Sequence, residues 1–89
     1  MKYRSRTDIA ALILEATLEG AGKTRIMYKA FLSYSQLKEY LTILLENGLI
    51  EYFADEEIFR ITERGRRFLY LYSQIIELIT LKSNSEINK

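Results

Sequence analysis

The hydrophobic periodicity of this chain changes twice, and the order of the changes limits the folds that it can adopt. Apolar residues recur every three or four positions up to about residue 47, which predicts three short helices over about 7–19, 24–29 and 33–47. Extended, β-rich runs follow at 49–53 and 58–61, and they predict a hairpin. The helical pattern then returns over about 63–82. The sequence therefore predicts a mainly α fold with one small β-hairpin and a long last helix.

Capping and turn residues mark the expected ends of these elements. Serine and threonine are favoured just before a helix, and glycine or asparagine just after one. The positions that we expect to play these parts are Thr7, Gly20–Gly22, Ser33 or Ser35, Asn47–Gly48 and Thr62. Two helices joined by a tight turn and followed at once by a hairpin are typical of a winged helix-turn-helix, in which the hairpin is the wing. We expect one domain over 1–89, with a core at about 7–62, a last helix at about 63–82, and loose ends at 1–6 and 83–89.

The size of the chain predicts that it needs a second source of stability. A domain of 89 residues buries only about 60% of the surface of its unfolded chain. The sequence has no cysteine and no histidine, so neither a disulfide nor an ordinary structural zinc site can supply that stability. Self-association is the remaining common route. The sequence therefore favours a homodimer.

The sequence contains few of the residues that enzyme active sites commonly use. Without histidine and cysteine there is no ordinary catalytic triad, no thiol nucleophile and no plausible catalytic zinc site. The run Gly20-Ala21-Gly22-Lys23-Thr24 looks like the end of a phosphate-binding loop, but it lacks the first glycine and a preceding strand. We expect no catalytic residue, no metal, no cofactor and no small-molecule ligand. No stretch is apolar and long enough for a signal peptide or a membrane span, so we expect a cytoplasmic, nucleoid-associated protein with no membrane partner.

Charge is segregated along the chain although its net value is only +1. Between Glu19 and Glu39 there are four bases and no acid, whereas Glu39 to Glu63 holds seven acids and one base. From Arg64 onward the balance is basic again. A fold that places both basic sets on one face would present a cationic surface to a polyanion.

Residues of the second and third helices are the candidates for contact with double-stranded DNA. In a helix-turn-helix the third helix reads the major groove with its first turns, and the helix before it crosses the phosphate backbone. Glutamine can bond adenine, and lysine can reach guanine or phosphate. The predicted DNA-binding residues are Lys23, Arg25, Lys29, Ser33, Tyr34, Ser35, Gln36, Lys38 and Arg60. A polar face is also what any solvated surface helix presents.

The wing is less favourable to DNA binding. Asp55, Glu56 and Glu57 at its tip would repel phosphate, and only Arg60 could bind it there. We favour a wing that stands clear of DNA, or an acidic tip that prevents the hairpin edge from pairing with another chain.

The last helix carries more apolar residues than one small domain can cover. They recur at steps of three and four, which is typical of a helix that pairs with another helix. The predicted dimer interface consists of Phe68, Leu71, Tyr72, Ile75, Ile76, Leu78 and Ile79. A helix lying on a membrane surface is the rival interpretation, but the basic residues gather at one end rather than along a polar face.

Several segments resemble one archaeal family. These segments are 22–30 (GKTRIMYKA), 32–37 (LSYSQL), 44–50 (LLENGLI) and 61–65 (ITERG). Over about residues 5–80 the chain resembles the winged-helix family typified by the small dimeric chromatin-type DNA-binding proteins of Sulfolobus. The resemblance implies a last helix that forms an antiparallel coiled coil with its twin, with a DNA-binding unit at each end of the dimer.

Two functions follow as hypotheses. The first is a homodimeric DNA-binding protein, acting as a transcription regulator or as a chromatin-associated organiser of DNA. The second is a protein–protein interaction module on a winged-helix scaffold without DNA binding, because a fold alone does not fix a function.

Overall fold

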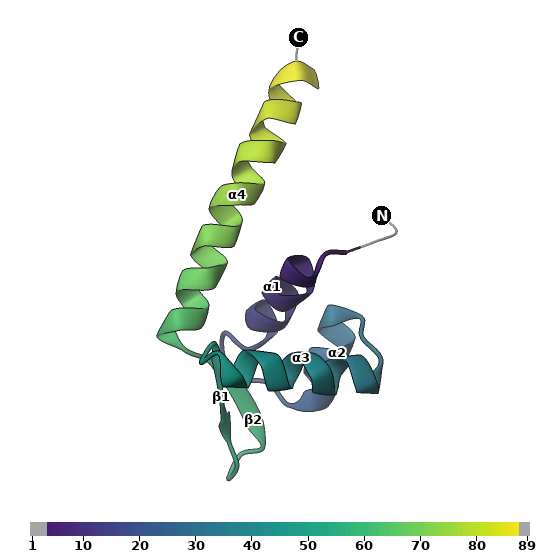
Figure 1. Cartoon of the computed structure of the whole chain (residues 1–89), viewed down its shortest axis with the longest axis vertical. Coiled ribbons are helices and arrows are strands. Elements are labelled where there is room, and N and C mark those ends of the chain that lie inside the picture. The colour runs from purple at the N-terminus through teal and green to yellow at the C-terminus, as the bar shows by residue number, and fades with distance from the viewer. Residues whose placement is uncertain (1–3, 88–89) are drawn as a thin grey trace.

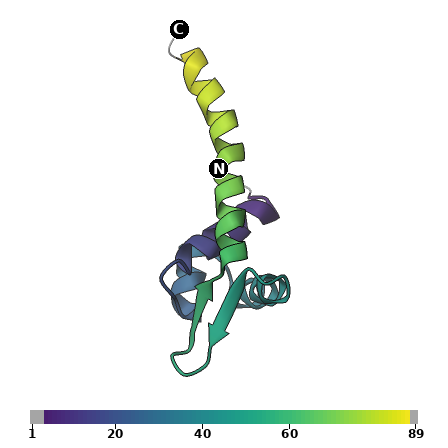
Figure 2. The same ribbon diagram turned by 90° about the vertical axis from the view of Figure 1, so that its left-hand side faces the viewer.

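The computed structural model describes residues 4–87, which form four helices and one hairpin (Figure 1). In chain order the elements are α1 (Arg6–Ala16), α2 (Lys23–Ala30), α3 (Tyr34–Glu46), β1 (Ile50–Phe53), β2 (Ile58–Ile61) and α4 (Glu63–Ile87). The first three helices and the hairpin make a compact head. The hairpin and α4 leave this head in opposite directions (Figure 2). The fold is a winged helix, as the sequence predicts.

Serine side chains cap the first and third helices. Ser5, not Thr7, caps α1: its Oγ accepts from the Asp8 amide at 3.0 Å, and Asp8 Oδ2 accepts from the Ser5 amide at 3.1 Å. The prediction of Thr7 was wrong because only Ser5 has a carboxylate three residues later, which completes a capping box. Of the two serines proposed for α3, Ser33 is the cap. Thr62 caps α4 as predicted, since its Oγ1 accepts from the Gly65 amide at 3.1 Å.

Two helix ends differ from the prediction. Helix α1 ends at Ala16, before the glycines at 20–22, because the buried Thr17 hydroxyl bonds the Leu14 carbonyl at 2.9 Å and ends the helix locally. Residues 5–6 and 83–87, expected to be loose, belong to the cap of α1, to α1 itself and to α4. The expectation for residues 1–3 and 88–89 lies outside the described residues.

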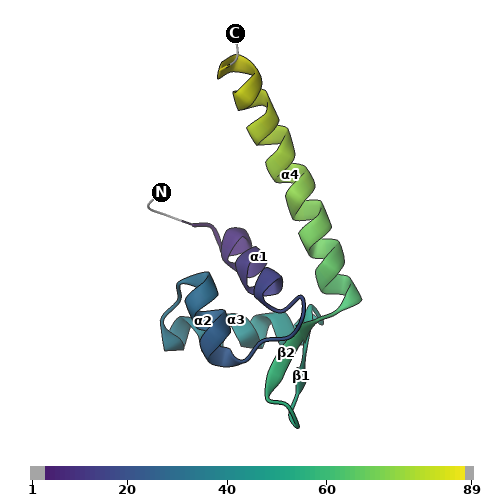
Figure 3. The same cartoon turned by 180° about the vertical axis from the view of Figure 1, so that it is seen from behind.

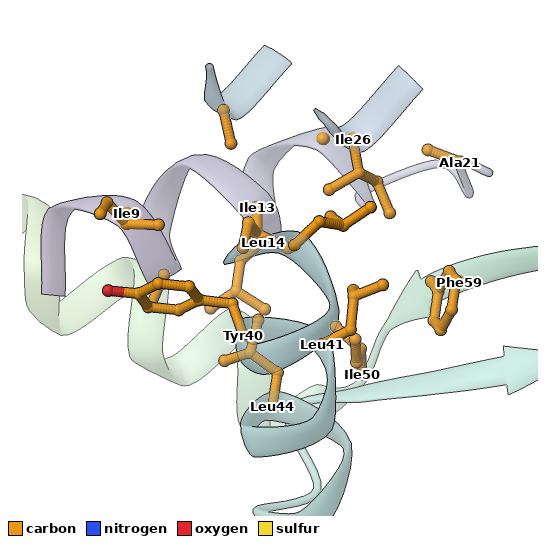
Figure 4. Packing of buried hydrophobic residues seen from close by; sticks show 14 of the residues in the cluster. Ile9, Ile13, Leu14, Ala21, Ile26, Tyr40, Leu41, Leu44, Ile50 and Phe59 are labelled. Carbon is orange, nitrogen blue, oxygen red and sulfur yellow. The ribbon is translucent and has the colours of Figure 1, made fainter. Parts of the chain in front are cut away.

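The core lies where α1, α2, α3 and the hairpin meet (Figure 4). Its largest fully buried side chains include Ile13, Leu14, Ile26, Leu37, Leu44 and Ile50. The buried stripe of α3 contains Tyr40, at 7% exposure, whereas Leu45 is 39% exposed. Helical geometry accounts for the difference, because position 40 lies about 40° from position 44 around the helix axis, whereas position 45 lies about 100° from it.

The hairpin joins the core by one of its faces. Its register pairs Ile50 with Ile61 and Tyr52 with Phe59. The Tyr52 and Phe59 rings lie 4.7 Å apart, and Ala21 forms a bridge to Phe59 through two backbone hydrogen bonds. The hairpin is therefore fixed to the end of α3 and to the segment before α2.

Helix α4 begins against α1 and then diverges from it (Figures 1 and 3). Phe68 and Leu69 pack on the core, and one turn later the Tyr72 hydroxyl donates to Asp8 Oδ1 at 2.5 Å. Beyond that contact α4 extends from the head, and the molecule measures 54 × 27 × 19 Å.

Gly65 is required at the first turn of α4, and its replacement by alanine is expected to destabilise the fold. A Cβ there would lie 2.3 Å from the Leu49 carbonyl oxygen, which is held by the Thr62 amide, and 2.6 Å from Ile61 Cγ1. We expect G65A to lower the free energy of unfolding by about 3 kcal/mol, or the Tm by roughly 15 °C. The exposed neighbour substitution R66A should change it by less than about 0.5 kcal/mol. Thermal melts of both variants check this, and equal melting temperatures would contradict it.

The hydrogen bond between Tyr72 and Asp8 makes stability depend on pH. It raises the pKa of Tyr72 from 10.0 to about 12 and lowers the pKa of Asp8 from 3.8. Because the pKa of Tyr72 is higher in the folded state, its contribution is complete below pH 10 and is lost as the pH rises towards 12. The Asp8 contribution is present above pH 3.8 and is lost as the pH falls.

We therefore expect wild type to melt above Y72F by a constant margin from neutral pH to about pH 10, and by a shrinking margin from there to pH 12. Melting curves at a series of pH values measure this margin. Y70F, at an exposed tyrosine on the same helix, is the control and should show no such change. A Y72F margin that stays constant to pH 12 would contradict the assignment.

Candidate nucleic-acid interface

A groove between α3 and the hairpin brings two of the predicted cations together. Lys23, at the start of α2, and Lys38, in the second turn of α3, both line it. Its other lining residues are Leu41, Thr42, Leu45, Tyr52 and Phe59. The fold therefore places two lysines that are 15 positions apart in the sequence along one groove.

The outward face of α3 is polar. Ser35 and Thr42 lie on the side opposite the buried leucines, with Lys38 on the flank nearer the hairpin. Glu39 and Glu46 share this outward face. Because the acids follow the first turn, the surface most favourable to a polyanion is the start of α3 and its hairpin side.

Two predicted contact residues are engaged in capping α3. The Ser33 Oγ accepts from the Gln36 amide at 3.2 Å, and the Gln36 Oε1 accepts from the Ser33 amide at 3.0 Å. A bidentate contact with adenine uses both the oxygen and the nitrogen of the glutamine amide. Gln36 is thus folded back onto its own helix end, and its base-reading capacity is reduced.

Tyr34 and Lys38 lie one turn apart and contact each other. The Lys38 ammonium is 5.7 Å from the centre of the Tyr34 ring, and the ring is 55% exposed. This contact keeps the cation at the start of α3.

The basic residues of α2 divide between two sides of the head. Lys23, Thr24 and Arg25 line a second hollow, next to Tyr52 and Glu57 of the hairpin. Helix α2 has no side-chain cap at Gly22, so its first amide groups are free to meet an anion.

Lys29 lies on a different side from Lys23 and Lys38. It lines the groove between α1 and α4, where Glu15 and Glu77 are also found. The structure therefore does not bring Lys29 together with the cations beside α3.

Arg60 also lies away from α3. In the strand register it lies opposite Glu51, on the face of the hairpin that faces away from Tyr52 and Phe59. Its guanidinium lies 5.9 Å from the Phe53 ring centre. The acidic tip, 55–57, is exposed, and Glu57 adopts a left-handed conformation with φ of 55°.

Sequence reasoning missed two lining residues of the α3–hairpin groove, Thr42 and Tyr52. Thr42 was visible as an outward-facing polar residue of α3, but it lies beyond the first turns to which the candidates were restricted. Tyr52 could have been found from strand alternation, because in a hairpin it must share a face with Phe59.

The predicted dimer residues of α4 separate into two groups. Phe68 and Tyr72 contact their own head. Five others are exposed, namely Leu71 (49%), Ile75 (56%), Ile76 (39%), Leu78 (73%) and Ile79 (63%). The head therefore leaves these five apolar side chains of α4 uncovered.

Metal and membrane features were searched over the part of the chain that the structure describes. Within it, no group of three or more acidic side chains is placed to hold a metal ion. None of its helices combines the length and the apolar character needed to cross a membrane.

Comparisons with known proteins agree with this architecture. A family model described as winged helix-turn-helix matches residues 3–80. The uncharacterised protein MJ0287 of Methanocaldococcus jannaschii is 35% identical over 82 residues, which are 91% of this chain and 79% of that protein. The crystal structure of Sso10a-2, a DNA-binding protein from Sulfolobus solfataricus, superposes with a TM-score of 0.78 at 25% identity, covering 96% of this chain and 92% of the other. The chain belongs to the winged helix-turn-helix family.

Proposed function

We propose that this protein binds double-stranded DNA as a homodimer. The observation that carries the proposal is the convergence of Lys23 and Lys38 in the groove between α3 and the hairpin, beside the polar face of α3. A winged helix-turn-helix presents its third helix to the major groove and surrounds it with phosphate contacts. The similarity to Sso10a-2, which is described as a DNA-binding protein, supports the same function.

In the proposed complex the start of α3 enters the major groove. Ser35 faces the base edges, and Lys23, Arg25, Lys38 and the free amides at the start of α2 hold one phosphate strand. Arg60 and Lys29 take no part, because each lies on another side of the head.

This geometry favours an architectural role over that of a sequence-specific regulator. Gln36, the best adenine reader in the sequence, is committed to the cap of α3. Lysine and backbone amides remain, and they bind phosphate regardless of sequence. The binding energy then comes mainly from phosphate contacts.

The exposed aliphatic face of α4 supports the homodimer. Leu71, Ile75 and Leu78 follow one another at steps of four and three, which is the spacing of a helix-pairing seam. In an antiparallel pair the two heads would lie at opposite ends, and each dimer would contact DNA twice.

Binding to random and genome-selected duplexes across a salt series tests the proposal, with the mass of the particle measured on the same sample. Uniform, steeply salt-dependent binding by a dimer is the expected result. A strong preference for a few two-fold sites would replace the architectural role with a regulatory one. No measurable affinity at low salt would overturn DNA binding and favour a protein-interaction module.

A further inference from the structure

Three exposed aromatic side chains lie in and beside the turn between α2 and α3: one in the last turn of α2, one at its C-cap and one at the first position of α3. Tyr28, Phe31 and Tyr34 are 71%, 77% and 55% exposed, and we call this group the aromatic turn. It lies at the end of α3 away from the hairpin (Figure 1). None of the three rings lines the groove that contains Lys23, although Lys38 lies between that groove and Tyr34.

Phe31 occupies its position against two local preferences. It caps α2 in the left-handed region, with φ of 55° and ψ of 53°, where glycine is the usual residue. It also exposes a large apolar ring that contributes little to the core. A strained and exposed bulky residue is unfavourable for the fold, which points to a role in binding.

Cations are held beside these rings. The Arg4 guanidinium donates to the carbonyl oxygens of Ala30 and Phe31, and it lies 6.0 Å from the Phe31 ring centre. The Lys38 ammonium lies 5.7 Å from the Tyr34 ring centre. From Gly20 to Lys38 the sequence has no acid, so the partner of this surface carries negative charge.

The chemistry of the exposed apolar groups distinguishes this surface from α4. On α4 the exposed apolar face is aliphatic, which suits packing of one helix against another. Within residues 20–44 every exposed large hydrophobic side chain is aromatic. Exposed rings next to fixed cations suit planar groups on a polyanionic backbone, which are the bases of an unpaired nucleic-acid strand.

We propose that the aromatic turn binds single-stranded DNA by stacking unpaired bases on Phe31 and its neighbouring tyrosines, with Arg4 and Lys38 near the phosphates. In a duplex the bases are stacked on one another and cannot reach the rings. This activity is therefore additional to duplex binding, and it would act where the duplex is open.

The test compares three probes of equal length: oligothymidine, an abasic deoxyribose-phosphate strand and a random duplex. Wild type is expected to bind oligothymidine about tenfold more tightly than the abasic strand, because only the former can stack. F31G should remove that preference. Its Tm should not fall, since glycine adopts the left-handed conformation without strain. Its affinity for the duplex should stay the same. Y70A, at an exposed tyrosine on α4, is the matched control and should behave as wild type.

Three results would overturn the proposal. One is equal affinity of wild type for the abasic strand and oligothymidine. The second is an undiminished preference for oligothymidine in F31G. The third is an equal loss of duplex and single-strand affinity in F31G, which would make the aromatic turn part of the duplex site. The duplex probe reports separately on the proposed function.

Discussion

Simultaneous charge reversal at Lys23 and Lys38 is expected to lower the affinity for duplex DNA by about 100-fold at low salt, while the fold is retained. Both lysines line the groove beside α3, and neither belongs to the core. Each phosphate contact adds about 0.9 to the slope of log affinity against log salt concentration. K23E/K38E removes two such contacts from each head of the proposed dimer and should therefore reduce that slope by about 4, in addition to the repulsion that the new carboxylates introduce. Fluorescence anisotropy over a salt series measures both quantities.

Lys29 provides the control for this experiment. It belongs to α2, as Lys23 does, but it lines the groove between α1 and α4. K29E changes the net charge by the same amount per site and removes no contact in the proposed complex. We expect it to lower affinity less than about threefold, through the long-range field alone. If K29E weakened binding as much as K23E alone, the DNA surface would not be the groove beside α3.

Most of the architecture could be predicted from the sequence because it depends on local patterns. Helical spacing, the extended runs and the Thr62 cap each act over a few residues, and all three agree. The errors arose where two local signals competed. Thr7 and Ser5 are both capping residues, and the choice between them depends on the carboxylate of Asp8, whose reciprocal bond only the structure shows.

The candidate site was less predictable, because it depends on which segments the fold brings together. Lys23 and Lys38 line one groove because the hairpin packs at the end of α3 and forms a bridge to Ala21. Lys29 and Arg60 have the same charge in the sequence but lie on other faces. The sequence cannot show which of these four cations lie beside α3, because all four have the same charge. Only long-range packing decides their positions.

Gln36 shows a different limit of sequence reasoning. The same pattern, serine followed three residues later by glutamine, predicts both a helix cap and an adenine reader at the start of α3. The structure shows the cap. The side-chain oxygen of Gln36 is already bonded to the end of its own helix and is poorly available for a base. The cap that stabilises α3 therefore competes with sequence-specific recognition of DNA.

A single carboxylate in the aliphatic face of α4 is expected to convert the proposed dimer into monomers. Ile75 is 56% exposed and takes no part in the core, so I75D should leave the packing of the head intact and lower its stability only by the loss of the partner. In a helix pair the new carboxylate would be buried without a partner, which costs on the order of several kcal/mol. Sedimentation or light scattering should give about 10.5 kDa for I75D, the mass of one chain.

The same substitution is expected to weaken DNA binding although Ile75 lies far from α3. A dimer that contacts DNA with two heads gains affinity from the second contact, commonly by a factor of about 100 or more. I75D should therefore bind duplex DNA about 100-fold more weakly than wild type, with roughly half its salt slope. Y70D, which places a carboxylate on a different side of the same helix, should remain a dimer with unchanged affinity. Dimers of I75D would show that another surface holds the two chains together, whereas I75D monomers of full affinity would show that one head suffices for binding.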